Sequence, residues 1–200
     1  MKRNIELIRR LLLEIEKNDD PTQAVAVTVD GYSPIEVAIL STVTAYGLTP
    51  RMARERSRLE VRLLKIAELM LICRYGLTDL SYPTRMNMPL ELGLLLAFGK
   101  ETFITSRKRY SALRTISDLN FGDIHYHEGS IRRLVVALSR WIEETCSGKR
   151  LTTETLLRRY RRLRRIRRLL GDDFDGLRPQ GITALLGVAK DEFQMILPGT

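Results

Sequence analysis

The sequence has only two cysteines in 200 residues, Cys73 and Cys146, which are too few for a disulfide scaffold or a four-thiolate zinc site. Its longest uninterrupted apolar runs, such as residues 94–98, fall far short of the roughly 20 residues that cross a bilayer. Charged residues within the first ten positions interrupt any signal-peptide core. We therefore expect a cytoplasmic protein with two reduced thiols and no membrane partner.

Positive charge is confined to one part of the chain. The 33 Lys and Arg residues exceed the 24 Asp and Glu residues by nine. Residues 149–170 contain ten basic residues and one acid, Glu154, so this segment alone carries a net charge of +9. The remaining residues hold 23 charges of each sign. The excess positive charge therefore offers a contact surface for an acidic partner over this one segment and not over the whole protein.

This basic segment predicts an amphipathic helix over residues 152–170. Its apolar positions recur at helical spacing: Leu156, Tyr160, Leu163, Ile166 and Leu170. The planar guanidinium group of arginine can bind a phosphate through two hydrogen bonds, so the candidate phosphate or nucleic-acid contacts are Arg161, Arg164, Arg165 and Arg168. A solvated face, or pairing with an acidic surface such as Asp172, Asp173 and Asp175, is the alternative that we favour, because a charge run alone says little.

Strand-like and helix-like patterns alternate through the middle of the chain. The predicted strands cover residues 24–29, 48–53, 74–81, 102–105 and 124–127. The predicted helices cover residues 4–17, 34–46, 59–72, 87–98, 130–146, 152–170 and 182–193, with a loop over 117–123. Such alternation predicts an α/β, flavodoxin-like (Rossmann-like), mainly parallel sheet with helices on both faces. An N-terminal helix (residues 1–20) and a C-terminal helical extension (148–200) would flank a nucleotide-binding domain at 21–147.

The helix expected from residue 34 has a complete start and stop signal. Ser33 can cap the helix, Pro34 suits its first position, and Glu36 can close a capping box. Gly47 would end it.

Residues 77–93 contain the strongest candidate site. Asp79 would end a strand, and Glu91 would lie in the first turn of the next helix, where free backbone N–H groups keep a carboxylate ionised. Ser81 and Asn87 are supporting polar groups, and Gly93 would allow close approach to a neighbouring backbone or a ligand. Such a carboxylate pair suits cleavage of an N-glycosidic bond, which develops positive charge on the sugar. Spacing alone favours the alternative that Glu91 caps its helix and Asp79 binds loop amides.

The same segment resembles a known signature. Asp79-Leu-Ser81, a short loop and then Asn87-Met-Pro-Leu-Glu91-Leu-Gly93 are similar to the motif of bacterial TIR-like and nucleoside 2-deoxyribosyltransferase-like proteins. The resemblance covers roughly residues 45–170 and includes Ile116-Ser-Asp118-Leu-Asn-Phe-Gly122-Asp123-Ile124 with His127. It implies that Glu91 is the catalytic carboxylate and that Asp79 contacts the sugar or base. It also implies NAD or a nucleoside as substrate, no required cofactor, and in some members a role in phage defence.

Residues 1–48 depart from that family. They resemble a group of small phage-associated proteins with a Met-Lys-Arg helix and a Gly-Tyr-Ser-x-x-Glu-Val helix start. Either Val25–Val29 serves as the first strand of the sheet, or the chain is a fusion with an incomplete sheet.

Three functions follow as hypotheses. The first is an enzyme, a hydrolase or transferase that acts on the N-glycosidic bond of NAD or a nucleoside. The second is a nucleotide sensor that binds without cleaving and switches a homo-oligomer. The third is a DNA-binding phage or prophage regulator that uses the basic helices.

A histidine pair is a weaker signal. His125 and His127 alternate on a predicted strand, but no third or fourth ligand is suitably spaced, so we expect no metal site.

Overall fold

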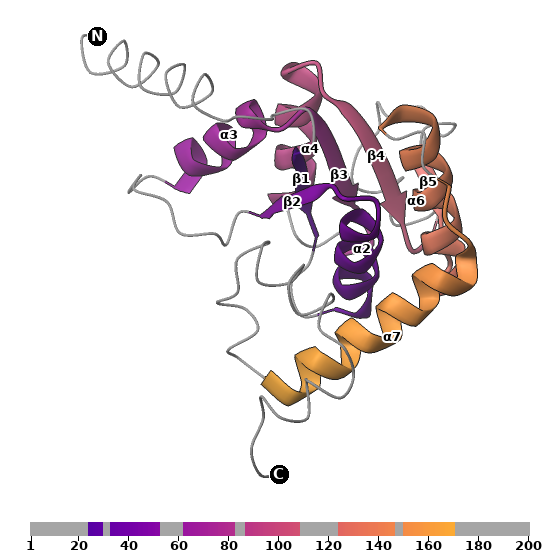
Figure 1. Cartoon of the computed structure of the whole chain (residues 1–200). Helices are drawn as coiled ribbons and strands as arrows, with labels where there is room; N and C mark the ends of the chain where they lie inside the picture. The colour runs from indigo at the N-terminus through magenta and orange to yellow at the C-terminus, as the bar shows by residue number, and fades with distance from the viewer. Residues whose placement is uncertain are drawn as a thin grey trace, which may run out of the picture.

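The protein is built on a five-stranded, all-parallel sheet with the strand order β2-β1-β3-β4-β5 (Figure 1). The computed structural model describes residues 24–29, 33–52, 62–82, 87–108, 124–146 and 150–170. The strands are β1 (Ala24–Thr28), β2 (Thr49–Met52), β3 (Tyr75–Asp79), β4 (Glu101–Ser106) and β5 (Ile124–Tyr126). This order is that of flavodoxin-like α/β folds. The predicted fold class is confirmed.

Helices cover both faces of the sheet. Helices α2 (Pro34–Ala45) and α6 (Ile131–Thr145) share one apolar cluster with β1, β3 and β4. Helices α3 (Arg62–Ile72) and α4 (Asn87–Ala97) cover the other face. The last described helix, α7 (Thr153–Leu170), packs on the outside of α2 and α6 (Figure 1).

Strand β1 shows why this segment folds at the centre of the sheet. Its side chains alternate, so that Val25 and Val27 enter the core under α2 while Ala26 faces α3 and α4. Burial on both faces demands the continuous apolar run that the sequence has here. Of the two alternatives for the N-terminal part, residues 25–29 therefore serve as a strand of the sheet, and the sheet is not incomplete.

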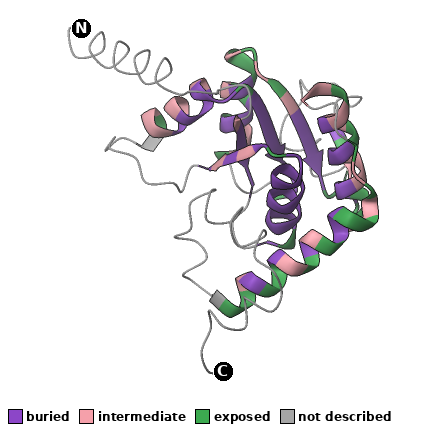
Figure 2. Ribbon diagram, viewed as in Figure 1, coloured by how far each residue is buried: buried purple, intermediate pink, exposed green. Residues whose placement is uncertain are grey.

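Helix α2 is buried on every side, because the sheet lies beneath it and α7 lies over it (Figure 2). Ser33 caps it as predicted, since its Oγ accepts a hydrogen bond from the Glu36 N–H at 3.1 Å. The Glu36 carboxylate is fully buried and forms an ion pair with Arg167 of α7, with 3.3 Å between Oε2 and Nη1.

Helix α7 belongs to the main core. Its buried stripe joins the cluster formed by the sheet, α2 and α6, and consists of Leu156, Leu157, Tyr160, Leu163 and Ile166. Its remaining faces alternate between half-buried and exposed residues (Figure 2). Thus the first part of the predicted C-terminal extension completes the domain.

Other predictions lie outside the described residues. They are the helices over 4–17 and 182–193 and the loop over 117–123. Among the helices that the structure describes, none combines the length and apolarity that crossing a membrane requires.

Candidate functional site

The carboxyl ends of the strands form the edge at which ligands of parallel sheets bind. From β1 the chain turns through α2 to β2 on one side, and β3 lies on the other side of β1. The topological switch point is therefore between β1 and β3. Thr28 ends β1 and Asp79 ends β3, so the predicted residue Asp79 lies at the position where the topology favours a ligand.

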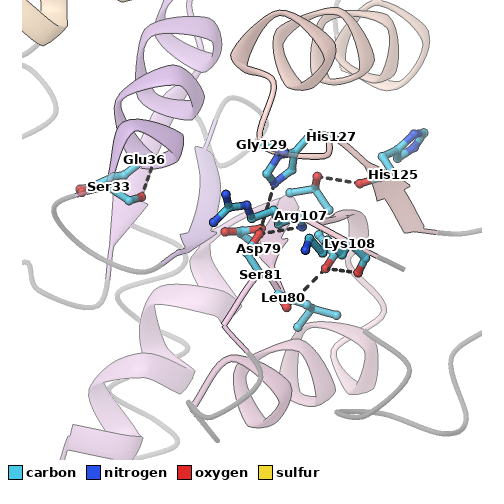
Figure 3. Close-up of polar contacts among 12 residues, drawn as sticks. Ser33, Glu36, Asp79, Leu80, Ser81, Arg107, Lys108, His125, His127 and Gly129 are labelled. Carbon is cyan, nitrogen blue, oxygen red and sulfur yellow. Dashed lines mark hydrogen bonds and ion pairs between the residues drawn. The ribbon is translucent and has the colours of Figure 1, made fainter. Parts of the chain in front are cut away.

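A buried polar network joins the ends of three strands (Figure 3). Ser81, two residues after β3 ends, donates its hydroxyl hydrogen to Oδ1 of Asp79 at 2.6 Å. The same Oγ accepts the backbone N–H of Arg107, which follows β4, at 2.8 Å. It also lies 3.2 Å from Nε2 of His127, which follows β5. Asp79, Ser81 and His127 are all buried.

The hydrogen bonds of His127 define its tautomer. Its Nδ1 accepts the backbone N–H of Gly129 at 3.0 Å, so in the neutral ring the proton is on Nε2. Nε2 then donates to Ser81 Oγ. Ser81 thereby uses its one donor and both acceptor positions, and its side chain has a single orientation.

This arrangement is not a Ser-His-Asp catalytic triad. In a triad the histidine nitrogen that faces serine carries no proton, and the aspartate bonds to the other nitrogen. Here Nε2 donates toward Ser81, and Oδ1 of Asp79 bonds to Ser81 and lies 3.8 Å from Nε2. Ser81 therefore positions Asp79 and is not a nucleophile.

Asp79 has one oxygen without a partner. Its side chain is fully buried, and no hydrogen bond reaches Oδ2 within the described residues. A buried acceptor of this kind is costly unless a donor meets it, by about 1–3 kcal/mol. A hydroxyl or N–H group of a ligand would satisfy Oδ2.

The turn after β5 holds the network in place. Glu128 and Gly129 both have positive φ, 52° and 79°, and this conformation turns the Gly129 N–H back onto His127. Glu128 forms an ion pair with Arg133 in the first turn of α6. The guanidinium of Arg107 lies over Gly129, since a Cβ added there would be 3.4 Å from Nε. Arg107 itself is exposed and places a positive charge at this edge.

Glu91 is buried, but the prediction that it lies in the first turn of its helix is wrong. Helix α4 begins at Asn87, so Glu91 is its fifth residue, and no acid lies in the first turn. Neither a capping role nor the free N–H groups of the helix terminus therefore explains why a glutamate is buried at this position. Leu95, one turn further along α4, packs against Gly76 of β3, so this face of α4 lies on the sheet.

Asp79 and Glu91 approach the sheet edge from opposite faces. Glu91 lies one turn before Leu95 on α4, toward the carboxyl edge, on the helix that covers the α3 and α4 face of the sheet. Asp79 follows the pleat to the other face, on the side of Tyr75 and Leu77. The two carboxylates therefore belong to opposite faces of the sheet.

The other predicted residues of this segment are exposed. Asn87 begins α4 and is exposed. Gly93 is also exposed, and a Cβ added to it would meet no atom of the described residues within 4 Å. Close packing on a described neighbour therefore does not account for Gly93.

The two histidines diverge. His125 is exposed and stacks on Phe103, with ring centroids 4.7 Å apart, whereas His127 turns inward to Ser81 (Figure 3). Burial and the positive charge of Arg140 lower the pKa of His125. Within the part of the chain that the structure describes, no three His, Cys, Asp or Glu side chains gather as metal ligands.

Sequence reasoning did not assign His127 and Arg107 to this site. Each is the first residue after a strand: His127 follows β5 and Arg107 follows β4. The rule that located Asp79, which looks for polar residues at strand ends, would have found both had it been applied to every strand.

The arginines predicted as phosphate contacts lie on α7, the helix that packs on α2 and α6 (Figure 1). Arg161, Arg164, Arg165 and Arg168 are all exposed, and Arg161 pairs with Glu154 at 3.4 Å.

Comparison with known proteins adds no family. No family model, curated protein or solved structure matches this chain. The resemblance to TIR-like and deoxyribosyltransferase-like proteins stays a prediction.

Proposed function

We propose that the carboxyl edge of the sheet binds a nucleotide, and that the protein cleaves or transfers the N-glycosidic bond of NAD or a nucleoside. The observation that carries the proposal is the buried Asp79 carboxylate, held by Ser81 at the switch point, whose Oδ2 meets no hydrogen-bond donor among the described residues. Ribose hydroxyls and amide N–H groups are donors of the kind that this oxygen needs.

Glu91 is the proposed catalytic carboxylate. Its burial supports this role, because a carboxylate in a low-dielectric site interacts strongly with a positive charge that develops nearby. In the reaction, the bond between C1′ and the base nitrogen breaks, and the electron pair leaves with the base. Glu91 stabilises the cationic sugar or forms an ester with it. Water, or a second base, then attacks C1′, and the proton of that nucleophile is released.

NAD suits such a site better than an ordinary nucleoside. Nicotinamide leaves NAD as a neutral base and requires no proton, whereas the base of a nucleoside requires a general acid. The one histidine in the network, His127, has its Nε2 proton engaged with Ser81.

The test is release of the base from NAD and from nucleosides, separated by chromatography. We expect nicotinamide release by the wild type and a loss of at least 100-fold in Glu91→Gln. Glu101→Gln is the matched control, because Glu101 is an exposed glutamate at the opposite edge of the sheet, where β4 begins. No release from any substrate, or undiminished release by Glu91→Gln, contradicts the enzymatic proposal. Nucleotide binding that survives Glu91→Gln without turnover in the wild type would instead indicate the non-catalytic sensor.

A further inference from the structure

One side of α7 carries arginines with buried nitrogens that meet no hydrogen-bond partner among the described residues. Arg159 and Arg162 are half-buried, one turn apart on the helix. Arg159 Nε and Arg162 Nη2 are shielded from solvent, and neither has a hydrogen-bond partner within the described residues. An unsatisfied, shielded donor on a charged group is an unfavourable feature unless a ligand supplies an acceptor.

The two guanidinium groups also repel one another. Burial lowers the pKa of Arg159, and the positive charge of Arg162 lowers it further. An anion bound at the accessible side of the two half-buried guanidinium groups would neutralise this repulsion.

Two exposed arginines extend the same side of the helix. At 100° per residue, the order around the helix is Arg165, Arg158, Arg162 and Arg159, and the four span about 120° of the helix surface. We call Arg158, Arg159, Arg162 and Arg165 the basic flank. From Arg158 to Arg165 it extends for about 10 Å, the length of roughly three phosphates along one strand of a duplex. The one acid of α7, Glu154, pairs with Arg161 outside this flank.

The composition of α7 favours a phosphate polymer over other anions. All its basic residues are arginines, whose planar forks match phosphate oxygens. A membrane surface would require apolar residues among the charges, whereas Leu169 is the one large apolar side chain exposed among the described residues of α7. The apolar stripe of the helix is buried in the core, so the flank is presented by a fixed helix.

We propose that the basic flank of α7 binds the phosphate backbone of a nucleic acid. Arg159 and Arg162 contact one phosphate, and Arg158 and Arg165 contact the two phosphates next to it. This surface is separate from the nucleotide site at the sheet edge and does not depend on the proposed enzymatic function. Contacts limited to the backbone predict binding without sequence preference.

The experiment measures fluorescence anisotropy of a labelled 20-base-pair duplex with the full chain at 50 to 200 mM NaCl. Neutralising three phosphates predicts that the logarithm of affinity falls with the logarithm of salt concentration with a slope of about −3. Arg158→Gln/Arg165→Gln should lower affinity at least tenfold and reduce the slope by about 2. The matched control, Arg164→Gln/Arg168→Gln, removes the same charge from exposed positions on the other side of α7 and should lower affinity less than threefold.

A second pair of variants tests the two half-buried groups. Arg159→Gln/Arg162→Gln should lose at least tenfold in affinity while its melting temperature stays equal or rises, because two unpartnered charges are removed. If this variant does not fold, the exposed pair above decides the result alone. No duplex binding at 50 mM NaCl, or equal losses in the two exposed double variants, overturns the proposal. Displacement of the duplex by 1 mM AMP also overturns it, since the flank would then be a site for a mononucleotide phosphate.

Discussion

The ion pair between Glu36 and Arg167 offers a sharp test of how α7 is held on the domain. The Glu36 side chain is fully buried and the Arg167 side chain is 13% exposed, and Arg167 Nη1 also donates to the Ser33 carbonyl oxygen at 3.5 Å. In Arg167→Ala, the buried carboxylate loses this guanidinium partner. Removing one partner of a buried pair typically costs about 3–5 kcal/mol, and we take the lower end, about 3 kcal/mol, because Arg167 is partly solvated.

For a protein of this size, a loss of about 3 kcal/mol lowers the melting temperature by about 6–12 °C. Urea unfolding followed by the fluorescence of the single tryptophan, Trp141, measures the same free energy. Trp141 is partly buried, 5.7 Å from the ring of Phe103 in the core, so its emission should report loss of tertiary structure.

Arg168→Ala is the matched control, because its side chain is exposed on the next position of the same helix. It should change the unfolding free energy by less than about 0.5 kcal/mol. Glu36→Gln combined with Arg167→Ala should recover part of the loss, since the buried charge is then gone. If Arg167→Ala costs no more than Arg168→Ala, the buried ion pair does not anchor α7.

Three further predictions concern stability. Tyr46 donates to Oε1 of Glu143 at 2.5 Å, and this bond lowers the pKa of Glu143 below its ordinary 4.5. The bond therefore stabilises the folded state fully above pH 4.5, and this stabilisation is lost as the pH falls through the lowered pKa. Tyr46→Phe should therefore lower the free energy of unfolding by about 1 kcal/mol at pH 7 and by less at pH 3. A loss that does not depend on pH contradicts this prediction. Gly76→Ala should lower the free energy of unfolding in urea by about 1–3 kcal/mol, because the new Cβ would lie 2.7 Å from the hydroxyl oxygen of Thr102. Gly93→Ala, on the open side of α4, should raise it by about 0.5–1 kcal/mol. Equal effects of the two substitutions would refute the packing argument. Gly129→Ala, at φ 79°, should cost about 1 kcal/mol by thermal unfolding, and a neutral effect would show that the turn tolerates an L side chain.

The fold was largely predictable because its signals are local. The run at residues 24–29 predicted a buried strand, and Ser33 with Pro34 predicted the start of α2, both of which the structure confirms. These elements depend on alternation, capping and helical spacing within a few residues. The polar network was not predictable in the same way, since Ser81 meets Arg107 and His127 across 26 and 46 residues.

Two site predictions differed from the structure for physical reasons. Helix α4 begins at Asn87, as predicted, but this start makes Glu91 its fifth residue, in the second turn, where the side chain is buried. The sequence suggested Asp172, Asp173 and Asp175 as acidic partners of the basic segment, whereas Arg167 pairs with Glu36, 131 residues earlier in the chain. Charge composition does not reveal such a contact, because the sequence separates the partners that the fold brings together.

The most direct test of the nucleotide site is the affinity for NAD measured by isothermal titration calorimetry with wild type, Asp79→Asn and Glu101→Gln. In Asp79→Asn the amide oxygen can still accept the Ser81 hydroxyl, while the unpartnered acceptor Oδ2 becomes an N–H donor. We predict saturable binding by the wild type, at least tenfold weaker binding by Asp79→Asn, and unchanged binding by Glu101→Gln. Binding that Asp79→Asn leaves unchanged, or no binding of NAD or any nucleoside by the wild type, would contradict the assignment of this edge as a nucleotide site.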